Sequence, residues 1–224
     1  VFIPDSVKKI GDAAFRDCAA LSAITMPESV AEIGNSAFEG CASLTSVKIP
    51  SSVKKIGSQV FRSCTSLRSV VIPDSVTSIG MRAFADCVSL TSVEIEGPVT
   101  RIGQEAFAGC RSLASVSVPD SVVEIGWHAF EACPVPDLRT ADGYLVVAGI
   151  LLDREEALAV ARVPTSVRRI GEEAFAGSAA LTAVDMPDSV VAIDARAFHG
   201  CTSLAAVAIP DSVAVIGERA FDGC

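Results

Sequence analysis

The sequence predicts an α/β solenoid, with parallel strands on a concave face and short helices on a convex face. A motif of 23 residues, Ile-Pro-Asp-Ser-Val-x-x-Ile-Gly-x-x-Ala-Phe-x-x-Cys-x-x-Leu-x-x-Val, recurs along the chain. A fixed period of this length is typical of stacked coils in which each repeat contacts only its neighbours. Within each copy a strand-like segment, a turn and a helix-like segment follow one another. Half of the residues are hydrophobic, which supplies a continuous core.

The repeats cover nearly the whole chain. Copies begin at Ile3, Met26, Ile49, Ile72, Ile95 and Val118, and the motif resumes at Val163, Met186 and Ile209. We therefore expect residues 1–224 to form a single solenoid of about nine repeats. Neither end resembles the polar capping repeat that a solenoid needs, so we expect the chain to be a segment of a longer protein.

The strand-like segment is Leu-x-x-Val-x-Ile, as in residues 44–49. Val47 and Ile49 alternate with Lys48, which is the pattern of a half-buried strand. The segment that follows, Pro73-Asp74-Ser75 in one copy, favours a turn, because proline ends regular pairing and Asp and Ser bond to the local backbone. The acidic residue of this turn could suggest calcium, but Ser51, Gly97 and Thr165 replace it elsewhere, and turn chemistry explains it without a metal.

The helix-like segment is Ile-Gly-x-x-Ala-Phe-x-x-Cys, as in residues 102–110. Ile102, Ala106, Phe107 and Cys110 fall at i, i+4, i+5 and i+8, which is one face of a short helix. Helices need roughly 8–10 Å between their axes, whereas neighbouring strands need about 4.8 Å. The wider backs would place the strands on the concave side.

Phenylalanine and cysteine hold fixed places in the repeat. Nine of the ten Phe residues share one repeat position, three residues before Cys or, for Phe175, before Ser178. This repetition predicts a buried ladder of rings. The eight Cys residues also share one position: Cys18, Cys41, Cys64, Cys87, Cys110, Cys133, Cys201 and Cys224. We expect free, buried thiols, because no copy holds two Cys and helical backs would keep neighbouring copies too far apart for a disulfide. The pattern offers no metal set, cofactor site or catalytic thiol.

The repeat is interrupted near residues 134–155. Tyr144–Val147 and the apolar residues 150–152 flank Ala148-Gly149, which predicts a tight β-hairpin after the turn signal Asp142-Gly143. The hairpin either packs on neighbouring coils or projects to bind a partner. Tyr144 is the only Tyr, and Trp127, the only Trp, lies in the copy just before, so both are candidate contact residues.

The outward strand positions are the other candidate surface. Most of these residues are small, and the polar exceptions are Lys48, Arg68 and Glu94 on consecutive strands. These three are the best candidates for contacting a partner, and the alternative is that they are ordinary solvated side chains. No phosphate loop or nucleophile–base pair occurs, so an enzyme is the least favoured class.

Net charge and hydropathy disfavour several classes of binding partner. The net charge is −9, which disfavours nucleic acid and anionic membrane surfaces. No run reaches the roughly 18 apolar residues of a membrane helix, so this segment is not expected to insert in a bilayer. We expect a monomer whose ligand is a protein on a cell surface or in the extracellular matrix.

The motif resembles the BspA-type leucine-rich repeat over nearly the whole chain. Asp142-Gly143-Tyr144 also resembles the start of an irregular unit common in that family, whereas Asp194 and Gly97-Pro98 depart from the repeat. The resemblance implies a leucine-rich-repeat solenoid from an extracellular or cell-surface protein of the adhesive type, and it transfers no catalytic residue. The leading hypothesis is thus a non-enzymatic protein-binding or adhesion module; the alternatives are a rigid structural spacer and an intracellular repeat scaffold.

Overall fold

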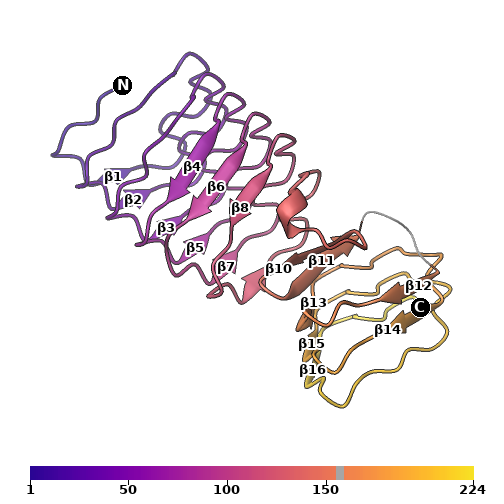
Figure 1. Ribbon diagram of the computed structural model, residues 1–224. Helices are drawn as coiled ribbons and strands as arrows, with labels where there is room; N and C mark the ends of the chain where they lie inside the picture. Colours follow the sequence, from indigo (N-terminus) through magenta and orange to yellow (C-terminus); the bar gives the residue numbers. More distant parts are fainter. Residues whose placement is uncertain (155–158) are drawn as a thin grey trace. The chain divides into compact units, whose positions relative to one another are not determined.

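The computed structural model describes residues 1–154 and 159–224, and the side chain of Arg154 is also outside the description. The last residue of the predicted insertion, Glu155, therefore lies outside the described residues, as does Leu158. Contacts divide the chain into two compact units, Val1–Asp137 and Leu138–Cys224 (Figure 1). Each unit is described by itself.

The strands of the first unit are short. They are β1 (Lys9–Ile10), β2 (Glu32–Ile33), β3 (Lys55–Ile56), β4 (Ser69–Ile72), β5 (Ser78–Ile79), β6 (Ser92–Ile95), β7 (Arg101–Ile102), β8 (Ser115–Ser117) and β9 (Glu124–Ile125). The 3₁₀ helix η1 spans Pro136–Leu138. The later strands are β10 (Tyr144–Val147), β11 (Ile150–Arg154), β12 (Val160–Arg162), β13 (Arg169–Ile170), β14 (Ala183–Asp185), β15 (Ala192–Ile193) and β16 (Val215–Ile216).

Parallel stacking of the strand-like segments is confirmed for residues 69–72, 92–95 and 115–117 and for residues 160–162 and 183–185. Residues 44–49, expected to be a strand, form only the bridge between Ala23 and Ser46, and residues 204–209 form no strand. Strands β4, β6 and β8 form one parallel sheet in the order β4-β6-β8, with Val70 opposite Val93 and Val93 opposite Val116. A second parallel sheet, β3-β5-β7-β9, runs through the Ile that precedes Gly in each copy, and the sequence analysis did not predict it. Partners in both sheets are one repeat apart, so each buried residue of these strands pairs with its equivalent in the next coil.

The short helices predicted for the convex face are wrong. Within residues 1–154 and 159–224 the only helix is η1, and residues 102–110 form a strand end followed by turns. The fold is therefore a β-solenoid of the leucine-rich-repeat kind rather than an α/β structure. We call the surface of β4, β6 and β8 the strand face, and the surface formed by the Ala-Phe-x-x-Cys segments the turn face.

Two left-handed residues, four positions apart in each copy, prevent helix formation. Gln59 and Ser63 have φ near +60° within one copy, and the equivalent residues of the other copies also have positive φ. Because a right-handed helix needs negative φ throughout, these residues split the segment into successive tight turns. Bonds within the turns, such as Cys64 N to Phe61 O at 3.2 Å, alternate with bonds to the next coil, such as Phe61 N to Ala83 O at 2.8 Å.

Bonding between coils sets the spacing of the turn face. Stacked Phe rings of neighbouring coils lie 5.1–5.5 Å apart and nearly parallel, from Phe15 to Phe130 and again from Phe175 to Phe221. This matches the strand spacing of about 4.8 Å far better than the roughly 8–10 Å of packed helices. The reason given above for a concave strand face, a wider back, is therefore wrong.

The second unit begins with the predicted hairpin. Strands β10 and β11 pair antiparallel, and β11 continues in parallel to β13, β15 and β16. Tyr144, Leu151 and Ile170 belong to one buried cluster with the core residues of the later coils. The hairpin thus packs on its neighbouring coils, as the first of the two alternatives proposed.

Candidate functional site

The polar candidates on the strand face lie in two rows along the stack. Val71 and Glu94 are paired in register, and Lys48 holds the same repeat position one copy before Val71. Lys48 and Glu94 are thus two coils apart, about 10 Å along the stack at the usual strand spacing. Arg68 precedes Ser69 at the start of β4 and belongs to a different row. All three side chains are exposed, but they do not form a single cluster.

A groove of about 540 Å³ opens on the strand face around Val71. Its walls come from the strand-like segments of two consecutive copies, residues 46–49 and 69–71, and from turn residues of these and the two flanking copies. The lining residues are Glu28, Ser46, Val47, Lys48, Ile49, Ser51, Ser69, Val71, Pro73, Asp74 and Glu96. Lys48 is therefore part of this groove, whereas Arg68 and Glu94 do not line it.

One wall of the groove is held by Glu28. Its carboxylate accepts bonds from the Ser51 backbone N at 2.7 Å and the Ser51 Oγ at 2.8 Å, and Lys48 Nζ donates to it at 3.0 Å. These bonds, Ser51 first, lower the pKa of Glu28. Ser51 is small where most copies carry Asp or Glu, so it leaves the space into which Glu28 turns.

The opposite wall depends on the altered turn Glu96-Gly97. A Cβ at Gly97 would lie 2.8 Å from the carbonyl oxygens of Pro73 and Val76, so glycine is needed for this close approach. Glu96 N donates to Ile72 O at 3.0 Å and fixes the turn against the preceding coil. The groove therefore forms where two copies depart from the consensus turn.

The two aromatic candidates lie elsewhere. Trp127 is partly buried on the turn face and meets the His128 ring edge-on, with centroids 4.3 Å apart. His128 Nδ1 lies 3.1 Å from Glu131 Oε2. Tyr144 is only 1% exposed and belongs to the core of the second unit. Tyr144 is therefore a core residue, and in this structure its side chain is not accessible to a partner.

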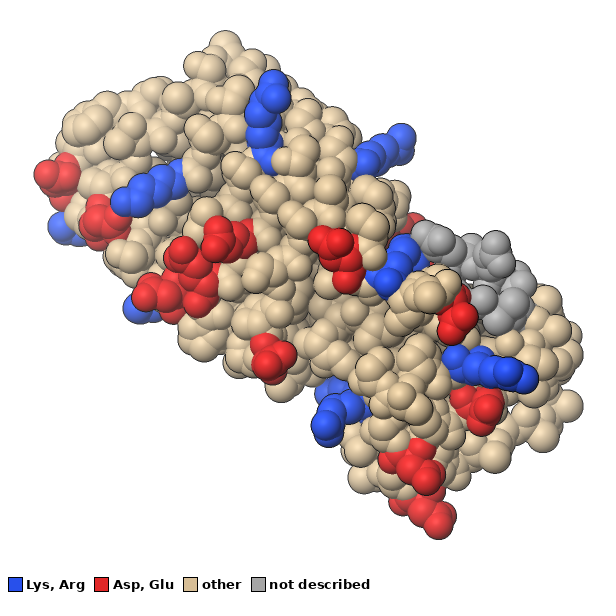
Figure 2. Space-filling view, viewed as in Figure 1, with Lys and Arg blue, Asp and Glu red and all other residues tan. Residues whose placement is uncertain are grey.

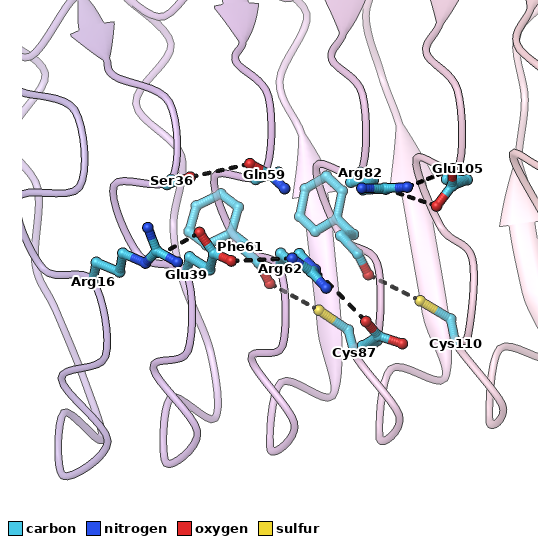
Figure 3. Close-up of polar contacts among 12 residues, drawn as sticks. Arg16, Ser36, Glu39, Gln59, Phe61, Arg62, Arg82, Cys87, Glu105 and Cys110 are labelled. Atoms are coloured by element: carbon cyan, nitrogen blue, oxygen red, sulfur yellow. Dashed lines mark hydrogen bonds and ion pairs between the residues drawn. The ribbon is translucent and has the colours of Figure 1, made fainter.

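The turn face carries a ladder of ion pairs that the sequence analysis missed. Glu39, only 7% exposed, lies 3.5 Å from Arg16 Nε and 3.3 Å from Arg62 Nη1, and Arg62 continues the ladder to Asp86 at 3.7 Å (Figure 3). Arg16, Glu39 and Arg62 hold the same position in consecutive copies. Alternating charge at one repeat position was the signal that could have predicted the ladder.

A second pair on this face is bidentate. Arg82 Nε and Nη2 donate to the two Glu105 carboxylate oxygens at 2.7 and 2.8 Å (Figure 3). These bonds lower the pKa of Glu105 and raise that of Arg82. A carboxylate held ionised by a guanidinium is poorly suited to donate a proton, so the pair is a structural contact rather than an acid–base group.

The burial predicted for the cysteines is confirmed for six of the eight, whereas Cys18 and Cys224 are exposed. Seven thiols donate to the Phe carbonyl of the preceding coil, for example Cys87 Sγ to Phe61 O at 3.1 Å. Burial raises the pKa of Cys41 to about 11 and that of Cys87 to about 12. Such thiols stay protonated at neutral pH, which makes them poor nucleophiles and poor metal ligands. Among the described residues, no group of three or more His, Cys, Asp or Glu side chains could hold a metal.

The charged side chains of the described residues on one face of the molecule form no single-sign patch. On the face seen in Figure 2, basic and acidic residues are interspersed and separated by wide uncharged areas. Over residues 1–154 and 159–224, no helix is long and apolar enough to cross a membrane.

Comparison with known proteins places this geometry in a family. The model for the BspA type leucine rich repeat region matches residues 1–110, 77–144 and 154–224. No curated protein sequence matches significantly. A leucine rich cell surface protein from Faecalibacterium prausnitzii is similar over the whole of this chain, with 34% identity and a TM-score of 0.61, and the chain spans 64% of that protein. A leucine-rich repeat protein from Bacteroides ovatus shares 26% identity with a TM-score of 0.45, and the match covers 100% of this chain and 84% of that protein.

Proposed function

Because the chain belongs to the BspA type leucine rich repeat family, we propose that it is a non-enzymatic protein-binding module of a cell-surface or secreted protein. The observation that carries the proposal is the groove on the strand face, since its walls depend on departures from a repeat that is otherwise regular. The similar protein from F. prausnitzii is described as a cell surface protein, which supports the location. On the turn face the carboxylates of Glu39 and Glu105 are held in ion pairs and most of the thiols are buried, which supports the proposal that the module is not an enzyme.

Binding can be tested with the intact chain immobilised on a sensor. Purified extracellular matrix proteins and purified cell-surface proteins are passed over it one at a time, and saturable binding of at least one is expected. A Lys48→Glu/Glu94→Lys variant reverses two exposed charges on the strand face without changing the net charge. We expect it to lose most of the binding, because charge complementarity governs both specificity and encounter rate.

A rigid spacer is the second candidate. The row Ser46, Ser69, Ser92 and Ser115 gives the strand face only small side chains along one line, and such residues are rarely interaction hot spots. A spacer needs stacked coils but no contact surface. Absence of saturable binding to every protein tested would favour the spacer and contradict the binding module.

A further inference from the structure

We propose that the strand-face groove binds an extended segment of a partner protein that presents an apolar side chain and, beside it, Lys or Arg side chains. The inference rests on the proposed function and names the chemistry of the segment that the module would recognise.

The apolar part of the groove is Val71. Its side chain is 44% exposed, whereas the same row holds charged Lys48 in the preceding copy and Glu94 in the following copy. Val47, Ile49 and Pro73 also line the groove. An exposed apolar side chain at the base of a hollow gains free energy when a partner side chain covers it, because apolar surface then leaves water.

The charges beside Val71 are negative and unneutralised. Asp74 and Glu96 line the groove, Glu94 lies opposite Val71 in the next strand, and none of these carboxylates forms an ion pair with a described residue. Lys48, the one cation that lines the groove, is already paired with Glu28 at 3.0 Å. Cationic side chains are therefore the complement of the free charge, and an acidic segment would be repelled.

The positions of these charges give the segment a direction. Asp74 follows Val71 at the end of β4, and Glu94 and Glu96 belong to the next copy, whereas Lys48 lies on the copy before. Alternate residues of an extended chain point to one side and are about 6.6–6.8 Å apart. A segment that runs alongside β4 toward the turn, with its apolar residue on Val71, would place its next two same-side residues about 7 and 13 Å beyond Val71, beside Glu96 and on either side of Asp74. This spacing matches the pattern Leu-x-Lys-x-Lys.

The probe is the peptide acetyl-Ser-Leu-Ser-Lys-Ser-Lys-Ser-amide, titrated into the ¹⁵N-labelled intact chain at low ionic strength. We expect saturable shifts of the amides of Ser69, Val71 and Asp74. The variant Asp74→Asn/Glu96→Gln should bind about fivefold more weakly, since two exposed charge contacts of up to about 1 kcal/mol each are lost. A Val71→Ser variant should also weaken binding, because it removes the apolar contact.

The matched control is Asp188→Asn/Asp211→Asn. It removes the same net charge at the equivalent Pro-Asp-Ser turn position in the second unit, and its affinity should stay within about twofold of the unaltered chain, because long-range charge effects are screened. Circular dichroism checks that each variant is folded.

Three results would overturn the inference: no shifts at the groove, equal weakening by both double variants, or equal binding of a peptide with Glu in place of Lys. A matrix or cell-surface protein that binds the Asp74→Asn/Glu96→Gln variant as tightly as the unaltered chain would also overturn it, while leaving the proposed function standing. Absence of binding to any protein would instead count against the proposed function itself.

Discussion

The two units are built from the same repeat but differ in how their stacks begin and in what their strand faces carry. In Val1–Asp137 each coil follows the last without interruption, and the Phe rings stack continuously from Phe15 to Phe130. In Leu138–Cys224 a hairpin comes first, and the stack runs only from Phe175 to Phe221.

The difference shows what a solenoid needs where its repeat is interrupted. A coil contacts only its neighbours, so the core of the next coil would be exposed unless another element covered it. Strand β11 pairs with β13 in the place of a preceding coil, and Tyr144 and Leu151 pack into the core beside it. The insertion is therefore structural, although its aromatic residue suggested a contact with a partner.

The strand faces differ in chemistry as well. The first unit carries Lys48, Arg68 and Glu94 and the groove beside Val71. The second unit carries Arg162 in register with Asp185, and the outward residues of its last copy are Ala205, Ala206 and Ala208. The first unit thus combines charged residues with the groove, and the proposed partner contact falls there for that reason.

The largest expected effect comes from removing one stacked ring in each unit. Phe84→Ala and Phe198→Ala each delete a fully buried ring and should cost about 4 kcal/mol of unfolding free energy. Trp127, the only Trp, lies in the first unit, so its fluorescence reports that unit during urea unfolding. Phe84→Ala should move the Trp127 transition to lower urea, and Phe198→Ala should leave it nearly in place. Equal shifts in both variants would mean that the units unfold as one cooperative structure.

A smaller loss is expected when the hairpin core is altered. Leu151→Ala should destabilise the second unit by about 3 kcal/mol, because Leu151 is fully buried beside the first coil of that unit. Hydrogen exchange of the backbone amides in residues 160–224 should accelerate, while those in residues 30–110 should not change. Leu152→Ala, at a half-buried neighbour in the same strand, is the control and should have a smaller effect. If both variants accelerate exchange equally, the hairpin does not cover the core as described.

Much of the fold follows from the sequence because the core repeats with the chain. Strand segments in several copies, the Phe ladder, six buried cysteines and the hairpin follow from the apolar residues of the sequence and are present in the structure. Residues 44–49 and 204–209 form no strand, and Cys18 and Cys224 are exposed. The helices were wrong because apolar spacing of i, i+4, i+5 and i+8 fits two consecutive turns as well as one helical face. The missed signal was the residue before Cys, which is Gly or Asp in most copies, such as Asp17, Gly40 and Gly109; these residues tolerate positive φ.

The groove could not be predicted from the repeat in the same way. Ser51 and Gly97 were visible as departures from the acidic turn position, but a sequence does not show that Glu28 turns toward Ser51 or that Gly97 meets the Pro73 carbonyl. Those contacts depend on how neighbouring coils stack. The charged residues Lys48, Arg68 and Glu94 were correctly expected to be exposed. The 23-residue spacing already places Lys48 and Glu94 at the repeat position of Val71, and the structure adds that Val71 and Glu94 are paired in register.

A modest pH effect is expected from the bidentate pair on the first unit. The pKa of Glu105 lies below the ordinary value of about 4.3, so its ion pair stabilises the folded state above that pH and the contribution is lost as the pH falls through the lowered pKa. Glu105→Gln should therefore reduce stability near neutral pH, by less than about 1 kcal/mol because solvent screens the pair, and the deficit should shrink below about pH 4. Glu124→Gln, which disrupts the more exposed pair with Arg101, is the control and should change stability less. A deficit that persists unchanged at low pH would show that packing, rather than charge, holds Glu105.

Thiol labelling is expected to perturb the structure least. It compares the reactivity of cysteines inside the stack with that of the cysteines in the first and last copies. Cys18 and Cys224 are exposed, whereas Cys41, Cys87 and Cys201 are buried and have raised pKa values. With Ellman's reagent at pH 8, the exposed pair should react first. A buried thiol whose pKa is raised to about 11, as for Cys41, holds over 100-fold less thiolate than an ordinary one and should react correspondingly slowly.

In denaturant without reductant, all eight thiols should react. This count matters because the coils stack at the ring spacing of 5.1–5.5 Å, so distance does not exclude disulfides between neighbouring copies. What opposes them is the bond from seven of the thiols to a Phe carbonyl, which a disulfide would break. Four or fewer reactive thiols would mean that this bond is lost and that neighbouring coils are covalently joined, in which case the stack would be held by bridges as well as by its core.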